Sequence, residues 1–439
     1  MPALDLNPQF QRALDLMENT DHHLFITGRA GTGKSTLLTH FREHTKKKIA
    51  VLAPTGVAAL NVRGQTIHSF FLIPPHITPL SAGKEKLSPR LKPICKALET
   101  IIIDEVSMVR AELLDCIDVL LRRYRGSQEP FGGVQMIFIG DLYQLPPVVS
   151  SNEEAQSFTM LYPSPFFFDA HVLGRTTFEL VQLEKIYRQR DTTFIDLLNR
   201  VRTNTTTPAD LEELNARWIE DHGSLSEHET TIVLTATNAA ADAINTARLA
   251  EIDEDEHTFG AVVQGNFDQR VYPTAESLTL KKGAQVMMLV NDPAGGYVNG
   301  SLGIIKQIGR EDEDVPSMIT VELTNGEDAT VAMHNWEIHR YSFDASISAL
   351  TTEPVGSFRQ FPLRLAWAVT IHKSQGKTFD RVVIDLGRGA FAHGQVYVAL
   401  SRCTSLDGIA LLRPIRNTDI KMDARVHTFF ERLTSSVSS

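Results

Sequence analysis

The segment GRAGTGKS at positions 28–35 constrains the fold of this chain more than any other part of the sequence. It follows the apolar run HLFIT and precedes STLLTHFREH, so a strand is expected before it and a helix after it. In that setting the spacing G-x-x-x-x-G-K-[ST] defines a P-loop. Gly28, Gly31 and Gly33 let backbone N–H groups turn inward around phosphate oxygens at the positive end of the helix. The segment therefore predicts an α/β sheet whose edge binds a nucleoside triphosphate.

Five polar side chains have the types needed around the nucleotide phosphates. Lys34 is expected to reach the β- and γ-phosphates, and Ser35 to supply a hydroxyl to Mg²⁺. Asp104 and Glu105 follow an apolar run; Asp104 is expected to hold Mg²⁺ through water, and Glu105 to activate the attacking water. Such an acidic pair is also common at surfaces and helix caps, but the upstream P-loop favours catalysis. Gln144 is expected to sense the γ-phosphate, with a plain turn residue as the alternative.

Short aliphatic runs recur along the chain in two sets, and helical patterns separate them. Near-continuous Val, Ile and Leu runs are typical of parallel strands that are covered on both faces. The sequence therefore predicts an α/β fold with two parallel sheets in tandem. The expected strands lie at 23–28, 48–56, 99–106 and 134–141 in the first set and at 231–238, 381–387 and 408–415 in the second, and the clearest helices lie at 113–124 and 240–252.

Two segments interrupt this pattern. Residues 72–93 are rich in proline and basic residues and lack apolar periodicity, which predicts a short ordered insert. Residues 294–358 begin with a glycine-rich stretch and contain a hairpin pattern around Asn325 and Gly326, which predicts a small β-barrel-like insert. The final residues, 433–439, end in SSVSS and are expected to be disordered.

Composition excludes several classes of protein. The 439 residues contain 43 Lys and Arg against 53 Asp and Glu, a net charge of −10, so any nucleic-acid contact must be a local channel. No run approaches the ~20 apolar residues of a membrane helix, and the N-terminal segment has no secretory signal pattern. Three widely spaced cysteines predict neither a zinc site nor a disulfide framework. A reducing, cytoplasmic location is expected, associated with the nucleoid if the source is bacterial.

Five blocks occur in a fixed order along the chain: APTGVAALNVRGQTIHSFF (53–71), GDLYQLPPV (140–148), LEKIYRQRDTTFIDLLNRVR (183–202), LAWAVTIHKSQGKTF (365–379) and GQVYVALSR (394–402). Together they resemble the 5′→3′ branch of the superfamily 1 DNA helicases, most closely the PIF (petite integration frequency) family, with the RecD-type helicases as near relatives. The resemblance implies two RecA-like domains with ATP between them and single-stranded DNA running across both. The first domain is then expected at 1–71 and 94–178 and the second at 179–293 and 359–432, with 294–358 as an SH3-like insert. Residues 72–93 are expected to act as a strand-separating wedge, because they come just after TIHSF and their prolines make the segment stiff.

The same resemblance implies that Arg188 in IYRQ and Arg402 in ALSR are arginine fingers. Charge that develops on the γ-phosphoryl oxygens needs cations, and supplying them from the second domain couples closure to hydrolysis. Without this resemblance, each arginine would be interpreted as a member of a surface ion pair. For adenine, the resemblance implies an N-terminal glutamine, and the spacing to the P-loop favours Gln11 over Gln9. The residues expected to bind the nucleotide are Gln11, Gly28, Ala30, Gly31, Thr32, Gly33, Lys34, Ser35, Thr36 and Gly376.

For DNA, the matched motifs imply short hydroxyl, imidazole and backbone donors, which suit phosphates and read few base edges. Phe70 is the candidate for stacking on a base, although a core position is the alternative for it and for Phe71. The run 166–168 and Trp367 are expected in the core, and His372 taken alone would be a buried structural histidine. The set expected to contact DNA is Pro54, Thr55, Gly56, Thr66, His68, Phe70, Thr370, His372, Lys373 and Gln375.

These features predict an ATP- and Mg²⁺-dependent helicase that moves 5′→3′ on single-stranded DNA and unwinds duplex or structured DNA. Its partners are expected to be single strands and junctions with duplex, without membrane contact, and the free protein is expected to be a monomer. Two alternatives stay open: a translocase that displaces proteins without productive unwinding, and a helicase-like scaffold without turnover. The presence of Lys34, Glu105, Arg188 and Arg402 argues against the scaffold.

Overall fold

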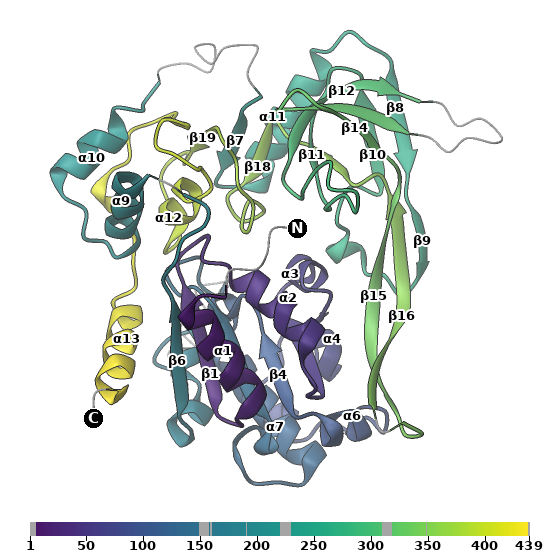
Figure 1. Cartoon of the computed structure of the whole chain (residues 1–439), viewed down its shortest axis with the longest axis vertical. Helices are drawn as coiled ribbons and strands as arrows, with labels where there is room; N and C mark the ends of the chain where they lie inside the picture. The colour runs from purple at the N-terminus through teal and green to yellow at the C-terminus, as the bar shows by residue number, and fades with distance from the viewer. Residues whose placement is uncertain are drawn as a thin grey trace. The chain divides into compact units, whose positions relative to one another are not determined.

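The computed structural model describes residues 6–148, 158, 160–189, 191–219, 230–309, 318–347 and 349–437. The chain folds into two compact units, each assembled from more than one stretch of sequence. The first unit contains Met1–Tyr187, Ile338–Val355 and Asp423–Ser439, and the second contains Arg188–Glu337 and Gly356–Met422. Figure 1 shows the helices and strands of both units with their labels. Within the described ranges, no helix has the length and apolar character needed to cross a bilayer.

The first unit is built on a parallel sheet with the strand order β3-β2-β4-β5-β1-β6. The central strands β4 and β5 are buried along their whole length, as expected for aliphatic strands with a layer on each face. In this sheet the four apolar runs of the first set form β1, β2, β4 and β5, and the edge strands β3 and β6 join them although neither was expected. Its strands are β1 (His23–Gly28), β2 (Ile49–Ala53), β3 (Gln65–Thr66), β4 (Thr100–Ile103), β5 (Gln135–Gly140) and β6 (Phe178–Leu183).

Helices cover both faces of this sheet. Phe10 of α1 and Phe41 of α2 share one core cluster with Ile26 of β1. The next side chain toward the N-terminus, Phe25, points to the opposite face, where it contacts Phe429 of α13. The helical segments of this unit are α1 (Pro8–Asn19), α2 (Lys34–His44), α3 (Gly56–Asn61), α4 (Ile67–Phe71), α5 (Pro79–Ala82), α6 (Leu91–Ala97), α7 (Ala111–Arg125) and α13 (Ala424–Val437), with short 3₁₀ turns η1 (Val106–Met108), η2 (Pro130–Gly133), η3 (Phe167–Asp169) and η4 (His171–Arg175).

The second unit contains a smaller parallel sheet with the order β18-β7-β19-β20. Helix α11 is fixed to it by Asn245, whose side chain accepts from the backbone N–H of Ala368 and donates to the carbonyl of the same residue, both at 2.9 Å. The three apolar runs of the second set form β7, β19 and β20, and β18 joins them although it was not expected. The predicted α/β class is confirmed. The elements are β7 (Ile232–Thr235), β18 (Ala368–Thr370), β19 (Val382–Asp385), β20 (Ile409–Leu411), α9 (Thr192–Arg202), α10 (Pro208–Asn215), α11 (Asn238–Ala250), α12 (Gln395–Leu400), η6 (Gln269–Val271) and η7 (Asn417–Asp419).

Antiparallel strands form three further sheets, in the orders β14-β13-β12-β11-β17, β15-β16-β9 and β10-β8. They belong to the second unit except for residues 338–355 of the β15–β16 hairpin, which belong to the first. The turn at Asn325 and Gly326 is present, because Leu323 N–H donates to the carbonyl of Glu327 at 2.8 Å and Gly326 has a φ of +82°. These strands are β8 (Glu256–Gly260), β9 (Val262–Gly265), β10 (Ser277–Lys281), β11 (Gln285–Met288), β12 (Leu302–Ile308), β13 (Ile319–Leu323), β14 (Asp328–Val331), β15 (His334–Asp344), β16 (Ala349–Gln360) and β17 (Leu363–Leu365).

The structure divides two segments differently from the sequence prediction. Strands β11 and β17 lie outside 294–358 yet share a sheet with β12, β13 and β14, and residues 338–355 belong to the first unit. Helix α13 also belongs to the first unit and continues to Val437, so residues 433–437 are helical where disorder was expected. Residues 438–439 lie outside the described part of the chain.

The tip of the β15–β16 hairpin, residues 338–355, packs on the first unit's sheet. The Tyr341 hydroxyl accepts from Val51 N–H of β2 at 2.9 Å, and Arg90 donates to the carbonyl of Tyr341 at 2.8 Å. The Phe70 ring meets the Tyr341 ring edge-on at 5.6 Å and is only 2% exposed. A ring enclosed in this way cannot stack on a base, so the prediction that Phe70 contacts DNA is wrong, and its alternative as a core residue is the one found.

Candidate nucleotide and DNA sites

The predicted nucleotide residues of the first unit meet at one edge of its sheet. Parallel strands end at the same edge, and loops that follow their carboxyl ends form the usual ligand crevice of open α/β sheets. The P-loop follows β1, Asp104 and Glu105 follow β4, and Gln144 lies in the loop after β5. Because β4, β5 and β1 are neighbours in the sheet, these three loops are adjacent.

The P-loop has the backbone shape that its glycines predict. Gly31 and Gly33 adopt left-handed conformations with φ of +80° and +85°, and Gly33 caps α2 without a side chain. A Cβ at Gly28 would lie 2.6 Å from Thr32 Oγ1 and 2.7 Å from the carbonyl oxygen of Leu183, so only glycine fits there. Because the glycines carry no side chains, backbone N–H groups at the start of α2 line the loop.

Lys34 and Asp104 supply opposite charges beside this loop. Lys34 Nζ donates to the carbonyls of Gly28 at 2.8 Å and Arg29 at 3.0 Å. Burial and, to a smaller extent, the charge of Glu105 raise the pKa of Asp104 to about 7, although the ammonium of Lys34 acts in the opposite direction. Two carboxylates with one ammonium favour a divalent cation, which would supply the missing positive charge. Asp104 and the exposed hydroxyl of Ser35 in the first turn of α2 are therefore fitting ligands for Mg²⁺.

Glu105 holds an unusual backbone conformation. Its φ of +51° lies in the left-handed region, which a residue other than glycine adopts at a cost of about 1–3 kcal/mol. The N–H of Met108 donates to the carbonyl of Glu105 at 3.1 Å, and this bond closes η1 behind it. Strain kept at a carboxylate beside a nucleotide loop supports a catalytic position rather than a surface acidic pair.

The loop after β5 is organised by Asp141, a residue that the sequence did not single out. Its carboxylate accepts from Tyr143 N–H at 3.2 Å, and its carbonyl accepts from Gln144 N–H at 3.0 Å. Asp141 is 1% exposed and Gln144 is 8% exposed. Asp141 therefore shapes the turn that carries Gln144. The predicted contact between Gln144 and the γ-phosphate stays a proposal. Asp141 follows β5 as Asp104 follows β4, and that repeated position was the available signal.

The residues around the expected adenine site give no preference between the two glutamines. Gln11 is exposed and donates to the carbonyl of Leu6 at 2.9 Å, and Gln9 donates to Glu184 at 3.3 Å. Tyr187, in the IYRQ block, lies nearer to the P-loop, because its N–H donates to the carbonyl of Gly31 at 2.9 Å. Its ring is 44% exposed, which makes it a further candidate for contact with the nucleotide.

The predicted DNA residues of the first unit follow the ends of β2 and β3. The hydroxyls of Thr55 and Thr66 accept from the N–H groups of Ala58 and Ser69, each at 3.2 Å. Each hydroxyl still has a hydrogen to donate to a phosphate oxygen. His68 is half-buried, and burial lowers its pKa, which favours a neutral imidazole. Pro54 and Gly56, on either side of Thr55, are half-buried as well.

In the second unit, the predicted arginine fingers bind the loop that follows β18. Arg402 donates to the carbonyls of Val398 at 2.8 Å and of Ser374 and Lys377 at 3.3 Å each. Arg188 donates to the carbonyl of Gly376 at 3.1 Å. Three blocks that are far apart in the sequence thus converge on residues 374–377. Arg402 is 1% exposed, and burial lowers the pKa of Arg188.

The same loop carries the predicted DNA residues. Thr370 ends β18 and accepts through Oγ1 from Lys373 N–H at 3.2 Å, and the side chains of His372 and Lys373 are exposed. Gln375 is half-buried, and its N–H donates to the carbonyl of His372 at 3.2 Å. Thr370 and Lys373 line a cavity of about 460 Å³ together with Arg364. Burial and the Arg364 charge lower the pKa of Lys373, and Asp242, which also lines the cavity, acts in the opposite direction, so the cavity holds two basic side chains and one carboxylate.

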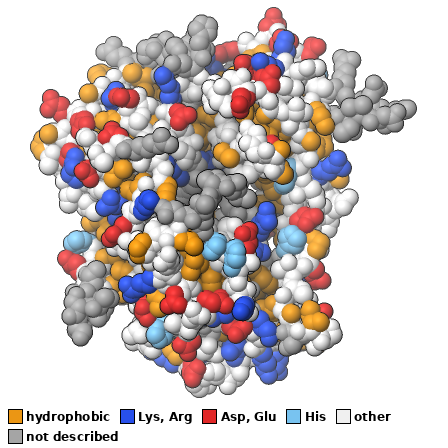
Figure 2. Space-filling model, in the orientation of Figure 1, with side chains coloured by type: hydrophobic (Ala, Val, Ile, Leu, Met, Phe, Trp, Pro, Cys, Tyr) orange, Lys and Arg blue, Asp and Glu red, His pale blue; other side chains and the backbone are white. Residues whose placement is uncertain are grey.

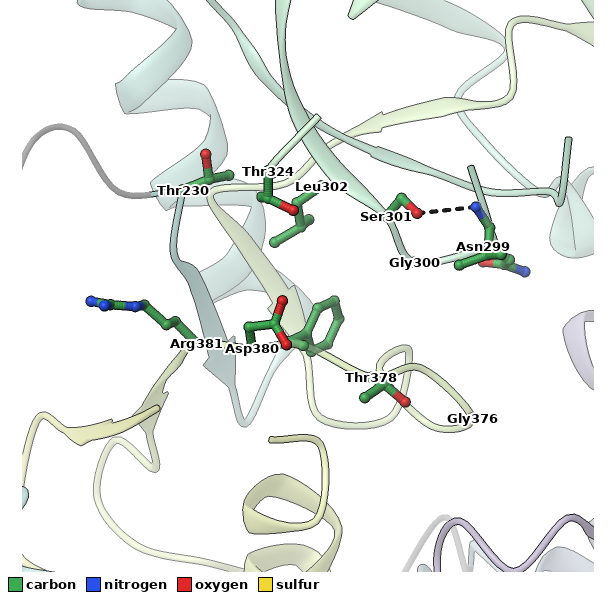
Figure 3. A pocket seen from close by; sticks show the side chains of 12 residues that line it. Thr230, Asn299, Gly300, Ser301, Leu302, Thr324, Gly376, Thr378, Asp380 and Arg381 are labelled. Atoms are coloured by element: carbon green, nitrogen blue, oxygen red, sulfur yellow. Dashed lines mark hydrogen bonds between the residues drawn. The ribbon is translucent and has the colours of Figure 1, made fainter. Parts of the chain in front are cut away.

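A second cavity, of about 500 Å³, lies on the other side of this loop. Figure 3 shows Asn299, Gly300 and Ser301 on one side of it and Gly376, Thr378 and Asp380 on another. Lys377 hydrogen-bonds to the Asn299 side chain, and burial lowers its pKa to about 8. Residues 374–377, which Arg188 and Arg402 bind, are therefore also attached to the loop that precedes β12.

Comparisons with known proteins decide the family. A family model described as PIF1-like helicase matches residues 8–211, and the 2B domain of the DNA helicase Pif1 matches residues 268–308. The ATP-dependent DNA helicase Pif1 of Bdellovibrio bacteriovorus is 35% identical over 93% of this chain and 88% of that protein. The chain belongs to the Pif1 helicase family. Human ATP-dependent DNA helicase PIF1 is 33% identical over 93% of this chain, which spans 61% of the human protein.

Solved structures of Pif1 from Bacteroides share this fold over nearly the whole chain. Unliganded Pif1 from Bacteroides sp. aligns with a TM-score of 0.89 and 38% identity, covering 98% of each chain. The complex of Bacteroides Pif1 with ADP-AlF4 aligns with a TM-score of 0.89 and 37% identity, covering 99% of this chain and 98% of that one. Bacteroides Pif1 bound to single-stranded DNA aligns with a TM-score of 0.70 at 38% identity over the same shares. The predicted family and RecA-like fold are confirmed.

Within this Pif1 family member, Arg364 is the clearest functional candidate that the sequence analysis missed. Its guanidinium donates to the carbonyl of Pro273 at 2.8 Å and faces the cavity that Thr370 and Lys373 line. Its place directly before the AWAVTIHKSQG block was the available signal. A charged residue between two strand-forming leucines is unusual in an apolar run, because burying a charge is costly unless it has a partner.

Proposed function

We propose that this chain is an ATP-dependent helicase that moves 5′→3′ along single-stranded DNA and separates duplex DNA. The observation that carries this proposal is the loop of the second unit, in which residues 370–375 offer groups suited to DNA while 374–377 are held by Arg188 and Arg402. One short loop thus joins the strand-gripping groups to the arginines expected at the nucleotide. The relatives named as ATP-dependent DNA helicases, and the Bacteroides structures with single-stranded DNA and ADP-AlF4, support the same activity.

The first unit supplies the groups for hydrolysis. The P-loop amides and Lys34 would hold the β- and γ-phosphates, and Ser35 and Asp104 would hold Mg²⁺, which supplies charge neutralisation at the phosphates when it is bound. Glu105 orients the attacking water and takes its proton. Gln144 contacts the γ-phosphate from the neighbouring strand loop.

Charge distribution is consistent with a channel rather than a basic surface. On the face drawn in Figure 2, Asp and Glu side chains stand among Lys and Arg side chains. Thr55, Thr66 and Thr370 offer neutral donors, and Lys373 with Arg364 adds local positive charge. A motor that releases its track at every step benefits from contacts of this modest strength.

The insert at 72–93 is proposed as the strand-separating wedge, and its anchoring supports that role. Arg123 of α7 donates to the carbonyls of Ala82 at 2.6 Å and Glu85 at 2.8 Å, and Ser88 N–H donates to the Tyr124 hydroxyl at 3.0 Å. An element that is fixed at several backbone positions can resist the force of an advancing duplex, whereas an unanchored loop would yield.

The decisive test compares ATPase activity with and without single-stranded DNA, followed by unwinding of 5′-tailed and 3′-tailed duplexes. We expect stimulation by single strands and unwinding of the 5′-tailed substrate alone. Unwinding of only the 3′-tailed duplex would contradict the polarity. Removal of streptavidin from a biotinylated strand without any unwinding would favour the translocase, and DNA binding without hydrolysis would favour the scaffold.

Glu105→Gln is expected to slow ATP hydrolysis about 10²–10³-fold while ATP and DNA stay bound. The amide keeps the size of the side chain but cannot accept the proton of the attacking water. Stopped-flow binding of a fluorescent ATP analogue, measured beside steady-state hydrolysis, separates the two effects. Glu43→Gln, an exposed glutamate on α2, is the matched control and should leave both unchanged. Normal turnover in Glu105→Gln would remove Glu105 from the catalytic role.

A further inference from the structure

We propose that the C-terminal helix α13 positions the Gln144 loop for hydrolysis through the ring of Phe430, which stacks on Tyr143. This inference rests on the proposed role of Gln144 at the γ-phosphate. The stacked pair has ring centroids 5.5 Å apart and an interplanar angle of 10°. Tyr143 is the residue directly before Gln144, so fixing its ring also restrains the backbone that leads into Gln144.

Helix α13, labelled in Figure 1, belongs to the first unit. Aromatic contacts attach it there. Phe429 stacks on Phe168 at 4.4 Å and meets Phe178 of β6 at 5.9 Å. Phe429 and Phe430 each approach Phe25 of β1 at 6.0 Å. Offset and edge-on ring pairs at these separations fix the relative placement of the elements that carry them. The helix is therefore attached to β1, the strand that leads into the P-loop.

The two neighbouring phenylalanines have different partners. Phe429 contacts rings of the sheet and of the run 166–168. Phe430 alone of the two stacks on the loop between β5 and Gln144. The helix thus connects the strand before the P-loop, through Phe25, with the loop of the proposed γ-phosphate sensor, through Tyr143.

The Gln144 loop needs such a support because little of it is regular structure. Beyond Gly140 at the end of β5, the chain turns on the two bonds of Asp141, and no strand or helix includes residues 141–148. Tyr143 is 6% exposed and Leu145 is 1% exposed, so a buried side chain flanks Gln144 on each side, and Tyr143 carries the aromatic ring of the two. A wall formed by Phe430 fixes that ring on one side. Phe430 is accordingly a positioning residue, which acts through Tyr143 and touches no reacting group.

Phe430→Leu tests this role, with Phe429→Leu as the matched control on the same helix. We expect Phe430→Leu to lower the kcat of DNA-stimulated ATP hydrolysis about tenfold, since small misplacements of a catalytic group have effects of this order or larger. Binding of ADP with aluminium fluoride should weaken by a similar factor while binding of ADP alone stays unchanged. Phe429→Leu should lower the melting temperature at least as much, yet leave kcat and the fluoride complex near those of the parent protein.

Two further variants keep the test decisive if Phe430→Leu folds poorly. Tyr143→Leu removes the other ring of the pair and should reproduce the loss of kcat, and Phe430→Tyr keeps a ring and should restore it. Equal kcat in the two leucine variants of α13, or loss of ADP binding together with kcat, would overturn the positioning role. Gln144→Ala, measured in parallel, separates the causes of failure. If Gln144→Ala loses the fluoride complex but Phe430→Leu does not, only this inference fails; if Gln144→Ala behaves as the parent, the proposed sensor fails first.

Discussion

Replacing Lys34 with alanine should abolish DNA-stimulated ATP hydrolysis, with a loss in kcat of at least about 10³-fold. The ammonium lies at the P-loop, where the carbonyls of Gly28 and Arg29 already orient it. Its removal also takes away the charge that lowers the pKa of Asp104, so the carboxylate expected to hold Mg²⁺ becomes harder to ionise. Both effects act against hydrolysis.

A malachite-green or coupled assay with saturating single-stranded DNA measures the effect of Lys34→Ala. Lys46→Ala is the matched control, because Lys46 is an exposed lysine just beyond the end of α2 and outside the nucleotide loops. Circular dichroism of both variants should match the parent. Turnover in Lys34→Ala within a factor of two of the control would place the hydrolytic site elsewhere.

The nucleotide edge of the first unit could be predicted from sequence because its determinants are local. The P-loop needs glycines where φ is positive, and Gly31 and Gly33 occupy two such positions within one short loop. Asp104 follows a strand that is recognisable by its isoleucines alone. In each case strand, loop and helix are consecutive, and parallel pairing then brings the loops to one edge without further information.

The failures concern contacts between distant residues. Nothing near Phe70 shows that Tyr341, from a hairpin tip far along the chain, encloses its ring. The limits of the β insert were missed for the same reason, since β11 pairs with β17 and β16 pairs with β9 across long separations. Helix α13 carries an apolar face, but its place on the first unit depends on Phe25 and Phe168, and pairings of that kind have no local signature.

Arg402 lies in a motif that the sequence reveals, and it also makes contacts with distant residues that only the structure reveals. Its substitution is the second large effect that we expect. Arg402→Ala should reduce kcat by about 10³-fold, the lower end of what arginine fingers contribute to phosphoryl transfer, and should weaken DNA binding far less. Its location in ALSR indicated a finger, whereas only the structure shows that its guanidinium also holds the carbonyls of Val398, Ser374 and Lys377. Alanine therefore removes a cation and releases the loop that carries Gly376.

Arg402→Lys distinguishes these two contributions. Lysine keeps the charge, but a single ammonium cannot reproduce the planar fork that reaches three carbonyls. If charge alone matters, Arg402→Lys should recover most of the lost kcat; if the fork is needed to shape residues 374–377, it should remain nearly as slow as alanine. We expect the second result, with DNA affinity, measured by anisotropy of a labelled strand, changed less than tenfold in both variants. A loss of DNA affinity larger than the loss of kcat would instead make Arg402 a support of the proposed DNA contacts at Thr370 and Lys373, because Arg402 holds the residues that directly follow them.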